Sequence, residues 1–159
     1  MDRKGHLPPA TSPLGFTLVE LMVTLAILAI IATIGVPSFQ RLIADYRVSA
    51  QANSVQGLLQ FARSEAVKRR ENVAVCLKAG VFEVRIGSCD DGSAPLRVLP
   101  LNHRVTLDGF NNAPGITYAP SGFLTDSPPT LTFGAEMASD RSICIMRSGF
   151  SDVSFDCSS

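Results

Sequence analysis

A long apolar stretch near the N-terminus constrains this chain more than any other feature. Residues 15–37 read GFTLVELMVTLAILAIIATIGVP, and residues 21–40 contain no charged side chain. An α-helix rises about 1.5 Å per residue, so this stretch is long enough to cross the roughly 30 Å hydrocarbon core of a bilayer. We therefore expect one membrane-spanning helix, with the larger part of the chain on one side of the membrane.

The residues at the start of this stretch form a specific pattern. Gly15-Phe16-Thr17-Leu18-Val19-Glu20, then the apolar run, then Pro37, resembles the class III signal of type IV pilins and type II secretion pseudopilins. The resemblance implies that a prepilin peptidase cleaves between Gly15 and Phe16, that Phe16 is then N-methylated, and that Glu20 and Pro37 serve assembly. The alternative is an uncleaved signal anchor, since residues 35–38 lack the small-residue pattern of an ordinary secretory cleavage site.

Elementary electrostatics also indicates a function for Glu20, independently of the resemblance. A carboxylate at the edge of a hydrocarbon segment is costly unless it is paired, so by default it marks function. Cleavage after Gly15 would create a free amine close by, and Glu20 of one chain could pair with the Phe16 amine of another. The alternative is that the Glu20 side chain extends to the membrane interface and stays solvated.

Beyond Pro37 the apolar pattern changes from uniform to amphipathic. Proline lacks an N–H and weakens the helix, so we expect a kink near Pro37. The helix is then predicted to continue to about residue 70, because apolar residues recur at three- and four-residue steps. The predicted apolar stripe consists of Phe39, Leu42, Ile43, Tyr46, Val55, Leu58, Leu59, Ala62 and Ala66.

The remainder reads as short strands separated by Gly, Pro, Asn and Asp clusters. The strand candidates are 72–78, 81–86, 96–99, 103–107, 115–119, 130–133, 142–147 and 151–155. The predicted fold class is therefore α+β, with a long N-terminal helix packed on a small antiparallel sheet around one core. The predicted segments are a leader (1–15), a transmembrane helix (16–39), its amphipathic continuation (40–71) and a β-rich head (72–159).

Within the pilin-like group, two head segments resemble the GspH/FimT subgroup. They are ARSEAVKR at 62–69, followed by VAVC at 73–76, and GITYAPSG at 115–122. The resemblance implies a pilin-like fold and one of three functions. The chain would be a minor pilin that starts or caps a type IV pilus, a minor pseudopilin of type II secretion, or a DNA-binding competence pilin. It also implies an inner-membrane protein with a periplasmic head. Its expected partners are other minor subunits, the major subunit and the prepilin peptidase.

Four cysteines follow the membrane segment, and an even count on the exported side favours disulfides. Three pairings are possible; we favour Cys76–Cys89 and Cys144–Cys157, because each closes a short loop that contains turn residues. A zinc site is the alternative, but Cys-x-x-Cys is absent and His103 is the one histidine left after cleavage. In Asp90-Asp91-Gly92 we expect a turn, since the glutamate that ends an EF-hand calcium loop is missing. No metal or cofactor is predicted.

Charge and motifs argue against the other function classes. Loss of residues 1–15 leaves 12 basic and 13 acidic side chains, so the chain has no overall attraction for nucleic acid. The Gly-Arg-x-Arg motif of competence pilins would align with Gly149-Phe150-Ser151-Asp152, where both arginines are replaced. DNA binding is therefore not favoured. His103 is expected in an exposed turn, and no catalytic motif is present, so we expect a structural subunit and no enzyme.

Overall fold

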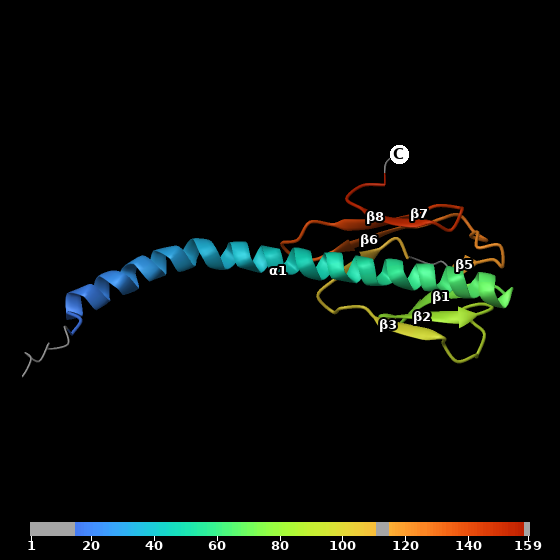
Figure 1. Ribbon diagram of the computed structural model, residues 1–159, viewed down its shortest axis with the longest axis horizontal. Coiled ribbons are helices and arrows are strands. Elements are labelled where there is room, and N and C mark those ends of the chain that lie inside the picture. The colour runs from blue at the N-terminus through green and yellow to red at the C-terminus, as the bar shows by residue number, and fades with distance from the viewer. Residues whose placement is uncertain (1–14, 111–114, 158–159) are drawn as a thin grey trace, which may run out of the picture. The chain divides into compact units, whose positions relative to one another are not determined.

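The computed structural model describes residues 15–110 and 115–157, which form one long helix and eight strands (Figure 1). The chain divides into two compact units, Met1–Ser38 and Phe39–Ser159, and each is described by itself. The elements are α1 (Leu18–Arg69), β1 (Val73–Lys78), β2 (Val81–Ile86), β3 (Arg97–Pro100), β4 (Thr106–Asp108), β5 (Ile116–Tyr118), β6 (Thr130–Gly134), β7 (Arg141–Ile145) and β8 (Ser151–Ser154).

The first unit contains the start of α1, which has a side-chain cap. The N–H of Glu20 donates to Oγ1 of Thr17 at 3.2 Å, so Thr17 satisfies one of the N–H groups that a helix start leaves free. Further along, the hydroxyl of Thr24 donates to the carbonyl of Leu21 and that of Thr33 to the carbonyl of Ile30. The helix thereby satisfies these two hydroxyls internally, as a segment in hydrocarbon must.

Pro37 lies inside α1, and the helix continues through it without a break. The boundary between the two units falls just after it, between Ser38 and Phe39. A kink at Pro37 stays a prediction.

The second unit contains two four-stranded antiparallel sheets where the sequence predicted one. The strand orders are β3-β2-β1-β5 and β4-β6-β7-β8. Strand alternation predicts which side chains face inward, but it does not choose the partner of each strand, and that choice separates the sheets. β1 pairs with β5, with Val73 opposite Tyr118, whereas β4 pairs with β6, with Thr106 opposite Gly134. The predicted strands differ from the observed ones only at their ends.

One core joins both sheets to the second half of α1, in accordance with the predicted α+β fold class (Figure 1). Phe82 and Val84 enter it from the first sheet, and Phe133 and Ile143 enter it from the second; all four are fully buried. The buried face of α1 consists of Ala44, Val48, Gln51, Ala52, Val55, Leu58, Leu59, Ala62 and Ala66. Its four alanines let both sheets approach the helix closely.

The predicted apolar stripe is wrong in its first part. Phe39, Leu42 and Tyr46 are exposed, and Ile43 is only half-buried. At 3.6 residues per turn, the face defined by Val55 to Ala66 extends back to Val48 and Ala44, whereas Phe39, Leu42 and Tyr46 lie on the opposite side of the helix. These three residues do form an apolar stripe, with the expected spacing of three and four residues. It is a second, exposed stripe, separate from the one that enters the core.

The helix ends one turn after its last buried residue. Arg70 adopts a left-handed conformation with a φ of +58°, which stops the helix at Arg69. In the last turn, Glu65 accepts hydrogen bonds from Arg69 at 2.8 Å and Lys68 at 3.3 Å. These two hydrogen bonds lower the pKa of Glu65 below its ordinary value. The predicted end near residue 70 is therefore close to the observed one.

Tyr118 is the largest fully buried side chain, and its hydroxyl has no hydrogen-bond partner among the described residues. Burial raises the pKa of Tyr118 to about 12, although the positive charge of Arg63 acts in the opposite direction. A buried polar group without a partner costs stability. Burial of the ring therefore stabilises the folded chain, whereas burial of the unpaired hydroxyl destabilises it.

We expect Tyr118→Phe to raise the free energy of unfolding by about 1 kcal/mol, because it removes an unsatisfied buried hydroxyl. The difference from wild type should grow above pH 10, since tyrosine ionises there in the unfolded chain but only near pH 12 in the folded one. Thermal unfolding of the full chain in detergent measures both effects. Tyr46→Phe, at an exposed position, is the matched control. A lower melting temperature for Tyr118→Phe than for wild type would contradict the assignment.

Candidate functional site

The residues predicted to direct processing lie together at the start of α1. Gly15 and Phe16 precede the helix, and the Phe16 side chain is 84% exposed. A Cβ atom added at Gly15 would meet nothing within 4 Å among the described residues. Packing against the described residues therefore does not demand glycine at this position.

Glu20 lies in the first turn of α1, with its side chain exposed. Its carboxylate forms no ion pair or hydrogen bond with any described residue, whereas its backbone N–H is held by Thr17. The positive end of the helix dipole favours a carboxylate in this turn. No cationic side chain among residues 15–110 and 115–157 pairs with it.

The helix cap at Thr17 is a feature next to the predicted processing site that the sequence reasoning missed. Thr17-x-x-Glu20 before an apolar run is the capping-box pattern, in which a threonine at the cap is followed three residues later by glutamate. Only the Thr17 half of this reciprocal pair is formed here. The Glu20 side chain therefore takes no part in the cap in this structure, although its position in the sequence would allow it to complete the capping box.

The first part of α1 exposes large apolar side chains around its circumference. It contains the one stretch of the described residues that is long and apolar enough to cross a membrane. Such a surface requires an apolar environment, which lipid or neighbouring apolar helices provide. The exposed residues are Leu18, Val19, Leu21, Met22, Val23, Leu25, Ile27, Leu28, Ile30, Ile31, Ile34 and Val36.

The four cysteines form the two disulfides Cys76–Cys89 and Cys144–Cys157, the pairing that the sequence favours. The first ties β1 to the turn after β2, and the second ties β7 to the segment after β8. Each closes a loop with a sequence separation of 13 residues. A loop of this length is worth roughly 3 kcal/mol if the bond acts by restricting the unfolded chain.

The segment aligned with the DNA-binding motif forms a tight turn. Gly149 has a φ of +79°, and a Cβ there would lie 2.1 Å from the carbonyl oxygen of Gly122. Phe150, at the first missing arginine position, is exposed, and the carboxylate of Asp152, at the second, accepts a hydrogen bond from the N–H of Val153. The nearby guanidinium of Arg141 lies 3.5 Å from the ring centroid of Phe155. The turn therefore presents an aromatic ring and a carboxylate in place of the two cations.

The remaining candidates lie in turns. His103 is exposed in the turn before β4. Asp91 accepts a hydrogen bond from the N–H of Ser88 at 2.7 Å and so stabilises the turn after β2. In residues 15–110 and 115–157, no three His, Cys, Asp or Glu side chains are grouped so that they could hold a metal ion.

Comparison with protein families identifies both parts of the chain. A prokaryotic N-terminal methylation motif matches residues 14–36, and the family described as type II transport protein GspH matches residues 51–149, more than half of the chain. The chain belongs to the GspH family. It is therefore a pilin-like protein of the GspH/FimT group, a group of structural pilin and pseudopilin subunits.

Solved structures agree on the fold of this GspH-family chain. The type IV minor pilin FimU of Pseudomonas aeruginosa has a TM-score of 0.58 at 21% identity, covering 67% of this chain and 91% of that one. The minor pseudopilin EpsH from the type 2 secretion system of Vibrio cholerae has a TM-score of 0.55 at 15% identity, covering 68% and 96%. At these identities the likeness concerns the fold alone. The comparison with curated proteins gives no match.

Proposed function

We propose that this GspH-family protein is a minor pilin that helps to initiate or cap a type IV pilus, after prepilin peptidase has cleaved it between Gly15 and Phe16. The observation that carries the proposal is the methylation motif at 14–36, which covers the start of α1, together with the exposure of every apolar side chain of the helix between Leu18 and Val36. That combination suits a subunit that leaves the lipid by exchanging it for neighbouring apolar helices.

In this proposal each segment has its own task. Residues 1–15 are the leader, 16–39 span the inner membrane once, 40–71 continue the helix, and 72–159 form the periplasmic head. Glu20 pairs with the methylated amine of Phe16 in a neighbouring subunit, and Pro37 gives the helix a weak point. The partners are the peptidase, the major subunit and other minor subunits.

A minor pseudopilin of a type II secretion system is the second candidate, because the matching family is described as a type II transport protein. The Cys144–Cys157 loop near the C-terminus favours the pilus role, since such loops are common in pilins. We do not propose DNA binding, because Phe150 and Asp152 stand where the competence pilins have arginine. We propose no catalytic activity.

The assembly role of Glu20 is tested by comparing two variants in sheared filaments from the native host. Glu20→Ala removes both the charge and the capping side chain, whereas Glu20→Gln keeps a side chain that can complete the capping box. Removal of one partner of a desolvated ion pair costs about 3 kcal/mol or more. We therefore expect both variants to insert in the membrane and both to be absent from filaments.

Normal incorporation of Glu20→Gln, with loss of Glu20→Ala alone, would show that Glu20 acts through the helix start and not through its charge.

Wild-type protein found in the sheared pili supports the pilus role. Its absence from pili, together with a secretion defect in the deletion strain, would support the pseudopilin role instead.

Processing is tested by Gly15→Ala. We expect an unshifted precursor band, because the peptidase is proposed to require glycine before the cut, whereas the described residues leave room for a Cβ there. Gly35→Ala is the matched control, since a Cβ at Gly35 also meets nothing within 4 Å of the described residues and alanine favours the helix. Gly35→Ala should be cleaved like wild type. Normal cleavage of Gly15→Ala would remove the proposed site.

A further inference from the structure

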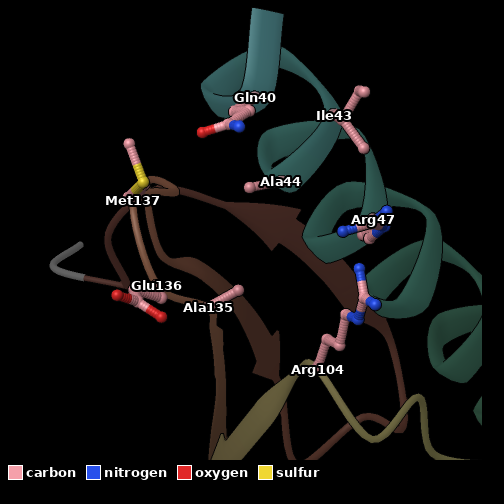
Figure 2. Close-up of a pocket in the computed structure, with 8 residues that line it drawn as sticks. All are labelled: Gln40, Ile43, Ala44, Arg47, Arg104, Ala135, Glu136 and Met137. Carbon is pink, nitrogen blue, oxygen red and sulfur yellow. The ribbon is translucent and has the colours of Figure 1, made fainter. Parts of the chain in front are cut away.

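A cavity of about 510 Å³ lies in the second unit, beside the first turns of α1 that belong to it. Helix residues 40–47 form one wall, the turn before β4 contributes Arg104, and the segment after β6 contributes residues 135–137 (Figure 2). Its size is that of a small-molecule site. The lining residues are Gln40, Ile43, Ala44, Arg47, Arg104, Ala135, Glu136 and Met137.

Two arginines dominate the charge of this cavity. Figure 2 shows Arg104, from the turn before β4, extending toward Arg47, from α1. Neither guanidinium forms an ion pair or hydrogen bond with any other described residue. Arginine stays charged at every physiological pH, so both side chains bring a positive charge to the cavity. An anion bound between them would be attracted by both charges.

The acidic side chains near the cavity do not fill this role. The carboxylate of Asp45 accepts a hydrogen bond from the N–H of Ser139 at 2.7 Å. Glu136 also lines the cavity, but Figure 2 shows it on the side away from Arg47 and Arg104, next to Met137. Met137 has a φ of +67°, a strained conformation of a kind that often occurs at ligand sites. The pair of guanidinium groups is thus left open to an external anion.

The position of the cavity in the chain suggests which anion is available. Gln40 is the last residue of the uncharged stretch 21–40, so the cavity begins where the proposed membrane span ends. On another face of the same turns, Phe39, Leu42 and Tyr46 are exposed, and tyrosine is enriched at membrane–water interfaces. The group nearest to this part of the chain is then a phospholipid headgroup.

We propose that Arg47 and Arg104 bind the phosphate of an anionic phospholipid, as a clamp between the head and the membrane surface. A guanidinium donates two parallel hydrogen bonds to phosphate oxygens, so the two arginines can hold the phosphate from two sides. The apolar wall of Ile43 and Ala44 suits the glycerol end of the lipid, and Glu136 can accept a hydrogen bond from a headgroup hydroxyl. The inference rests on the proposed membrane insertion of residues 16–39.

The test measures lipid binding to the full chain in detergent by native mass spectrometry, with phosphatidylglycerol and with phosphatidylcholine. We expect a preference for phosphatidylglycerol that falls about tenfold or more in Arg47→Gln and in Arg104→Gln, because each loses charged hydrogen bonds. Arg147→Gln is the matched control, since Arg147 is exposed and lies outside the cavity. It makes the same charge change and should bind like wild type. Retention of both disulfides verifies that the variants fold.

Equal phosphatidylglycerol binding by wild type, Arg47→Gln and Arg104→Gln would overturn the inference. Inorganic phosphate is tested in parallel, and binding of phosphate by wild type without binding of phosphatidylglycerol would also overturn it, since the site would then serve a free anion. Incorporation of the same proteins into bilayers separates this result from the proposed function. A chain that fails to insert contradicts both proposals, whereas one that inserts without lipid preference contradicts only the clamp.

Discussion

The apolar surface of α1 between Leu18 and Val36 is exposed and requires an apolar environment. This requirement limits where the rest of the chain can lie. At roughly 25 cal/mol for each Å² of apolar surface, such a helix is unfavourable in water. Its hydroxyls at Thr24 and Thr33 are bonded within the helix, so the segment brings no unsatisfied hydroxyl into an apolar environment. Lipid and a bundle of like helices both offer an apolar environment, so the proposed transfer from membrane to filament is physically reasonable. In that proposal the charge of Glu20 selects the register that apolar packing leaves open.

The head depends on the same helix in a different way. Neither four-stranded sheet encloses a core alone, and the buried face of α1 supplies the side chains that join Phe82 and Val84 to Phe133 and Ile143. The two disulfides tie β1 and β7, each an inner strand of its sheet, to the segments that follow β2 and β8. A helix committed to the core on one face leaves its other faces for partners. Phe39, Leu42 and Tyr46 occupy one such face, and the arginine cavity adjoins another.

How much could be predicted from sequence depended on whether the signal was local. Signals carried by consecutive residues predicted the methylation motif, the helix and the strands. The family models match the motif and the head, and the structure contains the helix and the strands. The partner of each strand is a long-range choice, so the division into two sheets was missed. The stripe containing Phe39 and Tyr46 was placed in the core because periodicity gives the spacing of a face but not its direction. Arg47 and Arg104 lie far apart in the chain, so no local pattern could join them. The Thr17 cap was local and could have been found.

The measurement that tests the account most directly is the intact mass of the protein purified from its native membrane. The account predicts a chain that begins at Phe16, carries one added methyl group and lacks the four hydrogens that two disulfides remove. That mass would establish processing, methylation and cross-linking of one molecule in a single experiment. A mass that corresponds to the full 159 residues without a methyl group would make the protein an ordinary anchored domain and would contradict the proposed role in a filament.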